Sequence, residues 1–190
     1  MSVLKIAIYG GTFDPVHHGH LILAREAREL FGFEKVIFVL AAVSPFKGSP
    51  AASAEMRSAM LRAAIEDEPG FVVDDCELRR PPPSYAIDTI EEIRTREADA
   101  ELYYLIGEDN VPTLSKWHRF DELSKAVQFI VLDRTGIPPA HPYPIVHRKI
   151  DISATEIRKR VASGQSIRYF VPHAVEQIIR RDKIYQEQAK

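Results

Sequence analysis

The sequence contains one cysteine among its 190 residues. A single cysteine excludes a disulfide framework and a zinc site built on several thiolates. No apolar stretch approaches the roughly 20 residues that a membrane-spanning helix needs, and no signal-peptide layout is present. The 25 Lys and Arg nearly balance the 27 Asp and Glu, and a net charge of −2 argues against a protein that coats nucleic acid or an acidic membrane. We therefore expect a cytoplasmic protein with neither nucleic acid nor membrane as a partner.

Apolar residues make up 45% of the chain and charged residues 27%, which is typical of a globular protein. A chain of this length buries roughly 70% of its unfolded surface, so one sizeable core is possible. Internal repeats and low-complexity tracts are absent from the sequence. We expect residues 1–190 to form a single domain, with a helical C-terminal part over about 151–190. The pattern allows a homo-oligomer but does not specify one.

Short apolar runs alternate with stretches whose apolar residues recur at helical spacing. Strands are expected at 3–9, 35–42, 71–78, 101–107, 127–132 and 144–150. Helices are expected at 21–31, 53–65, 84–96 and 119–125, and from about residues 153 and 172. This alternation predicts an α/β, Rossmann-like doubly wound fold, in which helices cover both faces of a mostly parallel sheet and further helices close the chain. Ligands of such sheets bind beyond the carboxyl ends of the strands.

The segment that follows the first expected strand, residues 10–21, carries the strongest functional signal. It has the wrong glycine spacing for a dinucleotide-binding loop, and it lacks the Gly-Lys-Ser/Thr of a phosphate-binding P-loop. Three interpretations remain: turn and capping chemistry, a metal site using His17, His20 and Asp14, or donors aimed at phosphates. Gly10 and Gly11 allow a ligand close to the backbone, and the start of a helix attracts anions. The phosphate interpretation has a modest lead.

Residues 152–158 form a second helix start. Ser153 and Glu156 have the spacing of a capping box, and Ile152 and Ile157 have that of the matching hydrophobic staple. Capping does not account for Arg158, which can grip phosphate oxygens through two parallel hydrogen bonds. The two roles are compatible, because a helix N-terminus is itself an anion site.

The run 12–15 (Thr-Phe-Asp-Pro), followed by His17-x-Gly19-His20, resembles the first motif of the nucleotidyltransferase superfamily that has the H-x-G-H signature. Residues 152–158 resemble the I-S-x-T-x-I-R motif of the same superfamily. The resemblance implies that both helix starts hold ATP, and it gives catalytic roles to His17, His20 and Arg158. The residues that it implies for ATP binding are Gly10, Gly11, Thr12, Phe13, His17, His20, Gly107, Asp109, Ile152, Ser153, Thr155 and Arg158.

The middle of the chain is similar to the bacterial nicotinate-nucleotide adenylyltransferase family. The similarity lies in Arg57 with Met60-Leu61, Glu77-x-x-Arg80, the segment 84–89, Gly107-Glu108-Asp109 with Trp117, and Arg134-x-Gly136. The chain departs from the family at Ala86, where Thr is common. The resemblance implies that ATP, accompanied by Mg²⁺, and nicotinate mononucleotide react to give deamido-NAD and pyrophosphate, with no metal site in the protein itself. The residues implied for the mononucleotide are Thr12, Lys47, Ser84, Tyr85, Ala86, Trp117 and Arg134.

Three alternatives to this function stay open at the level of the sequence. Nicotinamide mononucleotide or phosphopantetheine could be the acceptor, and a nucleotide sensor without turnover belongs to a different class. Backbone N–H groups at the helix start near Ser84 favour a carboxylate over an amide, because a carboxylate only accepts hydrogen bonds. Trp117 is the only tryptophan. It fits a core anchor as well as a ring that stacks on pyridine.

Overall fold

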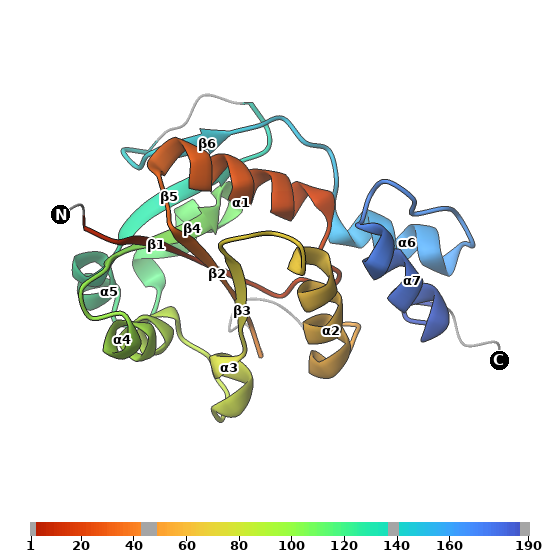
Figure 1. Ribbon diagram of the computed structural model, residues 1–190, viewed down its shortest axis with the longest axis horizontal. Coiled ribbons are helices and arrows are strands. Elements are labelled where there is room, and N and C mark those ends of the chain that lie inside the picture. The colour runs from red at the N-terminus through yellow and green to blue at the C-terminus, as the bar shows by residue number, and fades with distance from the viewer. Residues whose placement is uncertain (1–2, 43–48, 137–140, 187–190) are drawn as a thin grey trace.

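The computed structural model describes residues 3–42, 49–136 and 141–186. Within these residues six strands form one sheet: β1 (Lys5–Gly11), β2 (Lys35–Leu40), β3 (Phe71–Asp74), β4 (Glu101–Gly107), β5 (Gln128–Asp133) and β6 (Ile145–His147). The strand order is β3-β2-β1-β4-β5-β6, and every neighbouring pair is parallel (Figure 1). The predicted fold class is therefore confirmed.

Helices cover both faces of this sheet. They are α1 (His18–Phe31), α2 (Ala54–Ile65), α3 (Cys76–Arg79), α4 (Ala86–Arg96), the 3₁₀ helix η1 (Glu108–Lys116), α5 (Phe120–Ala126), α6 (Ala154–Ala162) and α7 (His173–Arg181). The core on one face includes residues of α1, α2, α6 and α7, and the core on the other includes residues of α3, α4, η1 and α5. In the described part of the chain, no helix combines the length and apolar character needed to cross a membrane.

Strand β1 lies in the middle of the sheet and is buried on both sides. Ala7 and Tyr9 belong to the core on the α1 face, whereas Ile6 and Ile8 belong to the core on the α4 face. Successive side chains of a strand point to opposite faces, so a strand covered on both faces needs apolar residues at every position. This requirement explains the uninterrupted apolar run at 6–9.

The strand order reverses between β1 and β4. From β1 the chain moves outward through β2 to β3, and it then returns to place β4 on the other side of β1. The connections after β1 and β4 therefore leave the sheet in opposite directions and open a crevice at its carboxyl edge. Helix α1 begins at His18, directly after the β1 connection, so its N-terminus points at this crevice.

The predicted third strand was wrong in its second half. Strand β3 ends at Asp74, and Cys76–Arg79 form the short helix α3. The physical cause is local, because the Asp74 carboxylate accepts a hydrogen bond from the backbone N–H of Cys76 at 2.9 Å. Such a turn ends a strand, and neither the apolar pattern nor the strand propensity of the segment reveals it.

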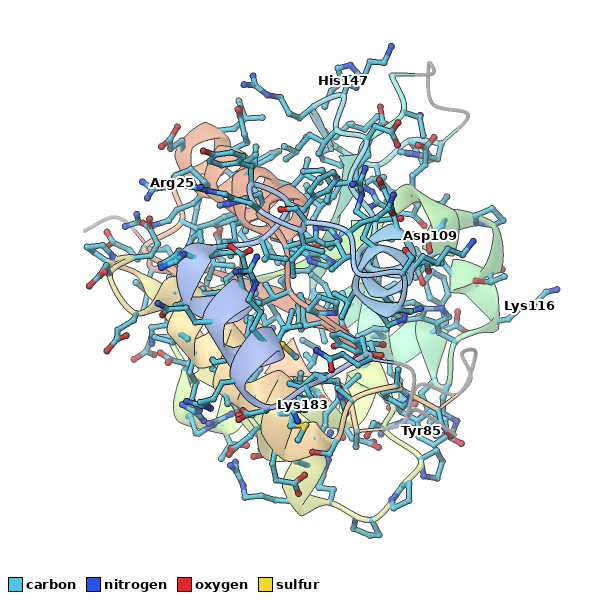
Figure 2. The ribbon with its side chains drawn as sticks, turned by 90° about the vertical axis from the view of Figure 1, so that its right-hand side faces the viewer. Arg25, Tyr85, Asp109, Lys116, His147 and Lys183 are labelled. Atoms are coloured by element: carbon cyan, nitrogen blue, oxygen red, sulfur yellow. The ribbon has the colours of Figure 1, made fainter. Side chains whose placement is uncertain are left out.

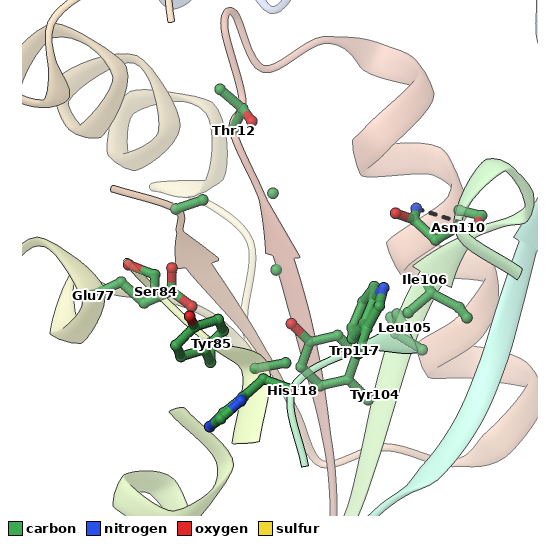
Figure 3. Close-up of a pocket in the computed structure, with 15 residues that line it drawn as sticks. Thr12, Glu77, Ser84, Tyr85, Tyr104, Leu105, Ile106, Asn110, Trp117 and His118 are labelled. Carbon is green, nitrogen blue, oxygen red and sulfur yellow. Dashed lines mark hydrogen bonds between the residues drawn. The ribbon is translucent and has the colours of Figure 1, made fainter. Parts of the chain in front are cut away.

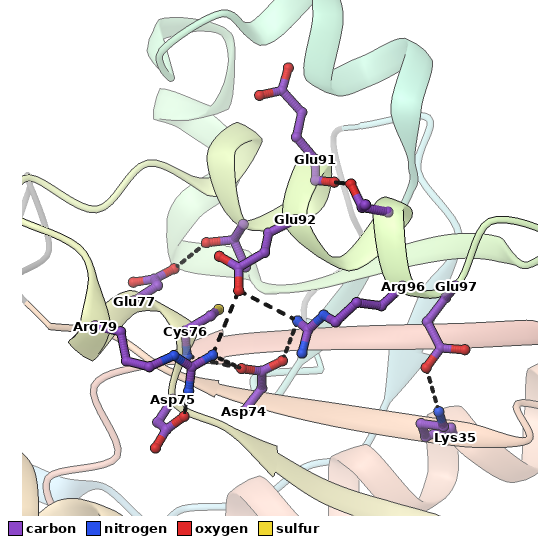
Figure 4. Close-up of polar contacts among 12 residues, drawn as sticks. Lys35, Asp74, Asp75, Cys76, Glu77, Arg79, Glu91, Glu92, Arg96 and Glu97 are labelled. Atoms are coloured by element: carbon purple, nitrogen blue, oxygen red, sulfur yellow. Dashed lines mark hydrogen bonds and ion pairs between the residues drawn. The ribbon is translucent and has the colours of Figure 1, made fainter.

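A polar network holds α3 and α4 against the end of β3 (Figure 4). Arg96 of α4 donates from Nη2 to Asp74 Oδ2 at 2.5 Å, and Arg79 pairs with Asp75 and lies 3.6 Å from Glu92. The network ties α3 to α4 and so fixes the position of the residues between them, 80–85, at the carboxyl edge of the sheet.

Candidate active site

Two adjoining cavities open at the carboxyl edge of the sheet. The large cavity has a volume of about 480 Å³ and the small cavity about 130 Å³. Both are lined by Gly10, Gly11, Thr12, Gly107 and Asn110. These shared residues come from the ends of β1 and β4 and the start of η1, so the cavities meet at the reversal of strand order.

The large cavity collects the two motifs and residues that follow β4 and β5. Its polar side chains include His17, His20, Asp109, Arg134, Ser153, Thr155 and Arg158. The structure thus brings together the residues that the sequence assigned to ATP, apart from Ile152. Ile152 packs against the core, and its carbonyl accepts a hydrogen bond from Arg134 Nη1 at 3.2 Å.

The two histidines of the first motif form one rigid unit. The backbone N–H of His17, the N-cap of α1, donates to His20 Nδ1 at 3.2 Å, and the two rings stack with centroids 3.7 Å apart. An acceptor role for Nδ1 assigns the proton of a neutral His20 ring to Nε2. A Cβ atom at Gly19 would lie 3.0 Å from His17 Nδ1. The glycine between the histidines therefore leaves room for the His17 ring.

His17 is buried and electrically neutral. Its exposed fraction is 1%, and burial, followed by the positive charge of Arg134 and the neighbouring His18, lowers its pKa to about 3. A neutral imidazole offers hydrogen bonds to an anion but no charge. Positive charge in the large cavity therefore comes from the guanidinium groups of Arg134 and Arg158.

The second motif places the N-terminus of α6 at the same cavity. Ser153 is the N-cap, and its Oγ accepts from the backbone N–H of Glu156 at 3.2 Å. The Glu156 carboxylate pairs with Arg160 Nε at 3.0 Å. Thr155 Oγ1 accepts from Arg158 Nη2 at 3.3 Å, as expected for side chains three residues apart on a helix.

Arg158 connects the two motifs. Its Nη1 donates to the backbone carbonyl of Asp14 at 2.7 Å and lies 3.9 Å from the Asp14 carboxylate. The Arg158 side chain keeps 32% of its surface exposed, and it lines the large cavity. The guanidinium is thus anchored at one end by the first motif while it faces the cavity.

The small cavity is lined largely by aromatic rings and backbone (Figure 3). Ser84, Tyr85 and Ala86 lie at the start of α4, and Trp117 follows η1. The Trp117 ring meets Tyr104 edge to face, with centroids 6.1 Å apart. Its Nε1 is buried and has no hydrogen-bond partner among the described residues. A buried donor of this kind at a cavity suits a ligand acceptor.

One residue predicted for the mononucleotide, Arg134, lies elsewhere. Arg134 lines the large cavity, together with the histidine motif and Arg158, and it does not line the small one. Lys47 lies outside the described residues. The remaining predicted residues, Thr12, Ser84, Tyr85, Ala86 and Trp117, all line the small cavity.

Four polar residues that line the small cavity were not among the predicted site residues: Glu77, Tyr104, Asn110 and His118. Tyr104 sits inside the apolar strand β4 and so looks like a core residue. Its hydroxyl reaches β1, where a Cβ atom at Gly10 would lie 2.5 Å from it. Asn110 follows Asp109 and lines both cavities, and His118 stacks on Tyr85 at 4.2 Å. Contacts of this kind depend on strand order, which the sequence pattern does not give.

Glu77 places an acid in the small cavity. It is 5% exposed, and burial raises its pKa, against the hydrogen bond from Thr89 Oγ1 at 2.8 Å and the charge of Arg80. Glu77 was recognised in the sequence only as part of the Glu77-x-x-Arg80 pattern. An ionised Glu77 disfavours an anionic ligand group within hydrogen-bonding distance of its own carboxylate.

The described residues of the site form no protein cage for a metal ion. Within residues 3–42, 49–136 and 141–186, no three His, Cys, Asp or Glu side chains are grouped closely enough to hold one. The arrangement instead offers donors and positive charge in one cavity and flat rings in the next. It can hold a phosphate chain beside an aromatic heterocycle.

Comparison with known proteins gives consistent results. Residues 8–160 match the model of the cytidylyltransferase-like family. A protein of Gemmatimonas aurantiaca named "Probable nicotinate-nucleotide adenylyltransferase" is 40% identical, over 97% of this chain and 93% of its own. One of the same name from Methylacidiphilum infernorum is 41% identical, over 95% and 92%. The fold matches "Plasmodium falciparum nicotinic acid mononucleotide adenylyltransferase complexed with NaAD" with a TM-score of 0.81 at 18% identity, over 96% of this chain and 97% of that one.

Proposed function

Since the chain belongs to the nicotinate-nucleotide adenylyltransferase family, within the cytidylyltransferase-like proteins, we propose that it transfers the adenylyl group of ATP to nicotinate mononucleotide. The products are deamido-NAD and pyrophosphate, and the reaction is a step of NAD biosynthesis. The observation that carries the proposal is the junction of the two cavities at residues 10–12. A nucleotide held in each cavity would bring its phosphate to this junction.

The reaction is an in-line displacement at the α-phosphorus of ATP. An oxygen of the mononucleotide 5′-phosphate forms the new P–O bond, the bond from the α-phosphorus to the bridging oxygen breaks, and pyrophosphate leaves with the electron pair. The attacking phosphate is already ionised at neutral pH, so the protein needs no strong base and forms no covalent intermediate. Its contribution is the positioning of both phosphates and the stabilisation of negative charge.

The large cavity supplies those two contributions. His20, through its Nε2–H, and the neutral His17 donate hydrogen bonds to phosphate oxygens, and Arg158 supplies positive charge where the pyrophosphate leaves. Ser153 and Thr155 present hydroxyl and backbone groups at the N-terminus of α6. Asp109, which lies at the start of η1 and lines the large cavity, contacts the ribose or adenosine under this proposal. Arg134 adds a second cation to the phosphate side of the site.

Mg²⁺ enters with ATP as part of the substrate. The grouping of acidic and histidine side chains in the described residues provides no dedicated cage, and Mg²⁺ bound to nucleotides keeps most of its ligands from phosphate and water. The ion neutralises part of the phosphate charge, and the protein groups orient the phosphates.

The small cavity selects the acceptor. Trp117 offers a ring face to the pyridine, and the N-terminus of α4 at Tyr85–Ala86 offers backbone N–H groups to its carboxylate. A carboxylate only accepts hydrogen bonds, whereas the amide of nicotinamide also donates. Donors here therefore favour nicotinate over nicotinamide. A charge-assisted hydrogen bond is worth roughly 1.5–3 kcal/mol, or about ten- to hundred-fold in affinity.

The whole chain acts as one nucleotidyltransferase domain under this proposal. Helices α6 and α7 share a core with α1 and α2, and α6 brings Ser153, Thr155 and Arg158 to the large cavity. The C-terminal part, about 151–190, therefore completes the ATP site.

The test is turnover by the purified protein. Mg-ATP is supplied with nicotinate mononucleotide, nicotinamide mononucleotide or phosphopantetheine in separate reactions, and pyrophosphate release is followed. We expect the highest kcat/KM with nicotinate mononucleotide. Absence of turnover with all three acceptors would refute the enzyme assignment, and a preference for the amide would refute the acceptor.

A further inference from the structure

Asp14 is a buried carboxylate that meets three separate segments of the chain. It is 6% exposed. Its Oδ2 accepts from the backbone N–H of Ala51 at 2.7 Å, and its Oδ1 accepts from that of Ala52 at 3.1 Å. Arg158 Nη1 lies 3.9 Å from Oδ2, and the Tyr185 hydroxyl donates to Oδ1 at 2.6 Å. Two carboxylate oxygens have about four acceptor sites, so the contacts fix the orientation of the group.

Tyr185 reaches Asp14 from the far end of the described chain. Helix α7 packs on α2, and Lys183 marks the turn that follows it (Figure 2). Lys183 and Tyr185 both adopt left-handed backbone conformations, with φ of 52° and 65°, and Ile184 between them is buried. For residues other than glycine this conformation costs of order 1 kcal/mol. Two such conformations, at Lys183 and Tyr185, accompany the placement of the Tyr185 ring beside Asp14 of the first motif.

The phenol is suited to act as a donor. Burial and the hydrogen bond to Asp14 both raise the pKa of Tyr185, so the hydroxyl keeps its proton. Arg57, which is 1% exposed, lies close enough to contribute positive charge, and its Nη1 donates to the carbonyls of Thr12 and Ala41 at 2.8 Å each. The Asp14 carboxylate therefore lies near the Arg158 guanidinium while the phenol fixes one of its oxygens.

Asp14 connects Tyr185 to the large cavity through its contacts with Arg158. Arg158 donates to the Asp14 backbone carbonyl at 2.7 Å and lies near its carboxylate, and Arg158 itself lines the cavity. Tyr185 does not line that cavity. The hydrogen bond to Asp14 is therefore the route by which we expect Tyr185 to affect the reaction.

We propose that Tyr185 is a positioning residue for adenylyl transfer, whose hydroxyl fixes Asp14 and thereby holds Arg158 in place for the phosphates of ATP. The proposal rests on the proposed function and adds a residue outside both cavities to its machinery. The proposal predicts an effect on ATP and none on the mononucleotide. Asp14 and Arg158 both line the large cavity, and neither lines the small one.

The variant Tyr185→Phe tests the role, since it removes only the hydroxyl. We expect kcat/KM for ATP to fall by about tenfold, the lower end of what one hydrogen bond to a charged group contributes. The KM for nicotinate mononucleotide should stay within about twofold of the wild-type value. Calorimetric titration with a non-hydrolysable ATP analogue should show a similar loss of affinity. Kinetics are measured well below the melting temperature of the variant, so that a loss of stability does not imitate the effect.

The matched control is Tyr169→Phe. Tyr169 also lies in the C-terminal part and has a left-handed backbone with φ of 71°, but its side chain is 77% exposed. We expect this variant to match the wild type in both substrate parameters. A loss in Tyr169→Phe equal to that in Tyr185→Phe would show that any tyrosine-to-phenylalanine change here disturbs the enzyme, and would overturn the specific role.

A double-mutant cycle tests whether the effect passes through Arg158. In the Arg158→Ala background Tyr185→Phe should change the affinity for the ATP analogue by less than twofold, because the group being positioned is gone. A loss that persists in this background overturns the proposal. Unchanged ATP parameters, or equal losses for both substrates, overturn it as well. Each of these outcomes requires an active wild type, whereas a wild type without turnover or analogue binding refutes the proposed function and the positioning role together.

Discussion

The large and small cavities share five lining residues but are built from different groups. The large one is formed by the N-termini of α1 and α6, two stacked histidines and two guanidinium groups. The small one is formed by three aromatic rings, an imidazole and the start of α4. Charged donors suit phosphates, which all nucleotide substrates carry, and flat rings with a few backbone donors suit one heterocycle. Under the proposed function, this difference separates the part of the site that performs the chemistry from the part that chooses the substrate.

The most direct test of this difference between the cavities is to remove a hydrogen-bond donor from the large one. We expect Arg158→Ala and His20→Ala each to lower kcat by roughly 10²–10³-fold, as the loss of one donor to a developing charge does in other enzymes. Circular dichroism should show that both variants remain folded. Unfolding of either variant would instead show that the motifs act mainly as helix caps.

The small cavity should respond to the loss of its indole. In Trp117→Ala the stacking surface is removed, and we expect the KM for nicotinate mononucleotide to rise by about tenfold, from a stacking contribution of roughly 1–3 kcal/mol. The KM for ATP should change by less than twofold. Mononucleotide affinity equal to that of the wild type would make Trp117 a core residue and remove it from the site.

The neutral His17 makes stability depend on pH. An imidazole in the unfolded chain has a pKa near 6.5, while burial lowers that of folded His17 to about 3. Between these values the unfolded chain binds more protons, so stability falls as the pH falls below about 6.5. We expect this residue alone to cost about 2 kcal/mol of unfolding free energy between pH 6.5 and pH 5.

Urea unfolding of the wild type and of His17→Gln at several pH values measures that slope. The variant should lose less stability on acidification, even where its stability at neutral pH is lower. Equal slopes in the two proteins would mean that folding leaves the pKa of His17 unchanged, so that the large cavity would gain a further positive charge only as the pH falls below about 6.5.

The smallest effect is expected from restoring the residue common in the family at the start of α4. Ala86→Thr adds a hydroxyl to the lining of the small cavity, and one neutral hydrogen bond contributes about 1 kcal/mol. We expect roughly fivefold tighter binding of nicotinate mononucleotide and unchanged ATP parameters. Titration calorimetry with each substrate decides this, and a gain for ATP instead of the mononucleotide would contradict the division between the cavities.

The sequence predicts the parallel sheet because the spacing of apolar residues differs between strands and helices. Residues 101–107, for example, form a strand as expected. The sequence does not predict strand order, since an apolar run does not specify its neighbour. This is why Tyr104 and Asn110 were missed, while His17 and Arg158, which lie in local motifs, were found. That these residues bind substrate stays a prediction. The end of β3 at Asp74 depends on a single side-chain hydrogen bond, which hydrophobic patterning cannot register.

The hydrogen bonds of Asp14 have a consequence for the order of folding. The hydrogen bond to Arg158 spans 144 positions of the chain, and the hydrogen bond to Tyr185 spans 171. Contacts across such distances close large loops, and their entropy cost is met only after nearer contacts have formed. The sheet can therefore assemble while the catalytic groups are still apart. We therefore expect a nascent or refolding chain to form its sheet first and to join the two motifs of the large cavity last.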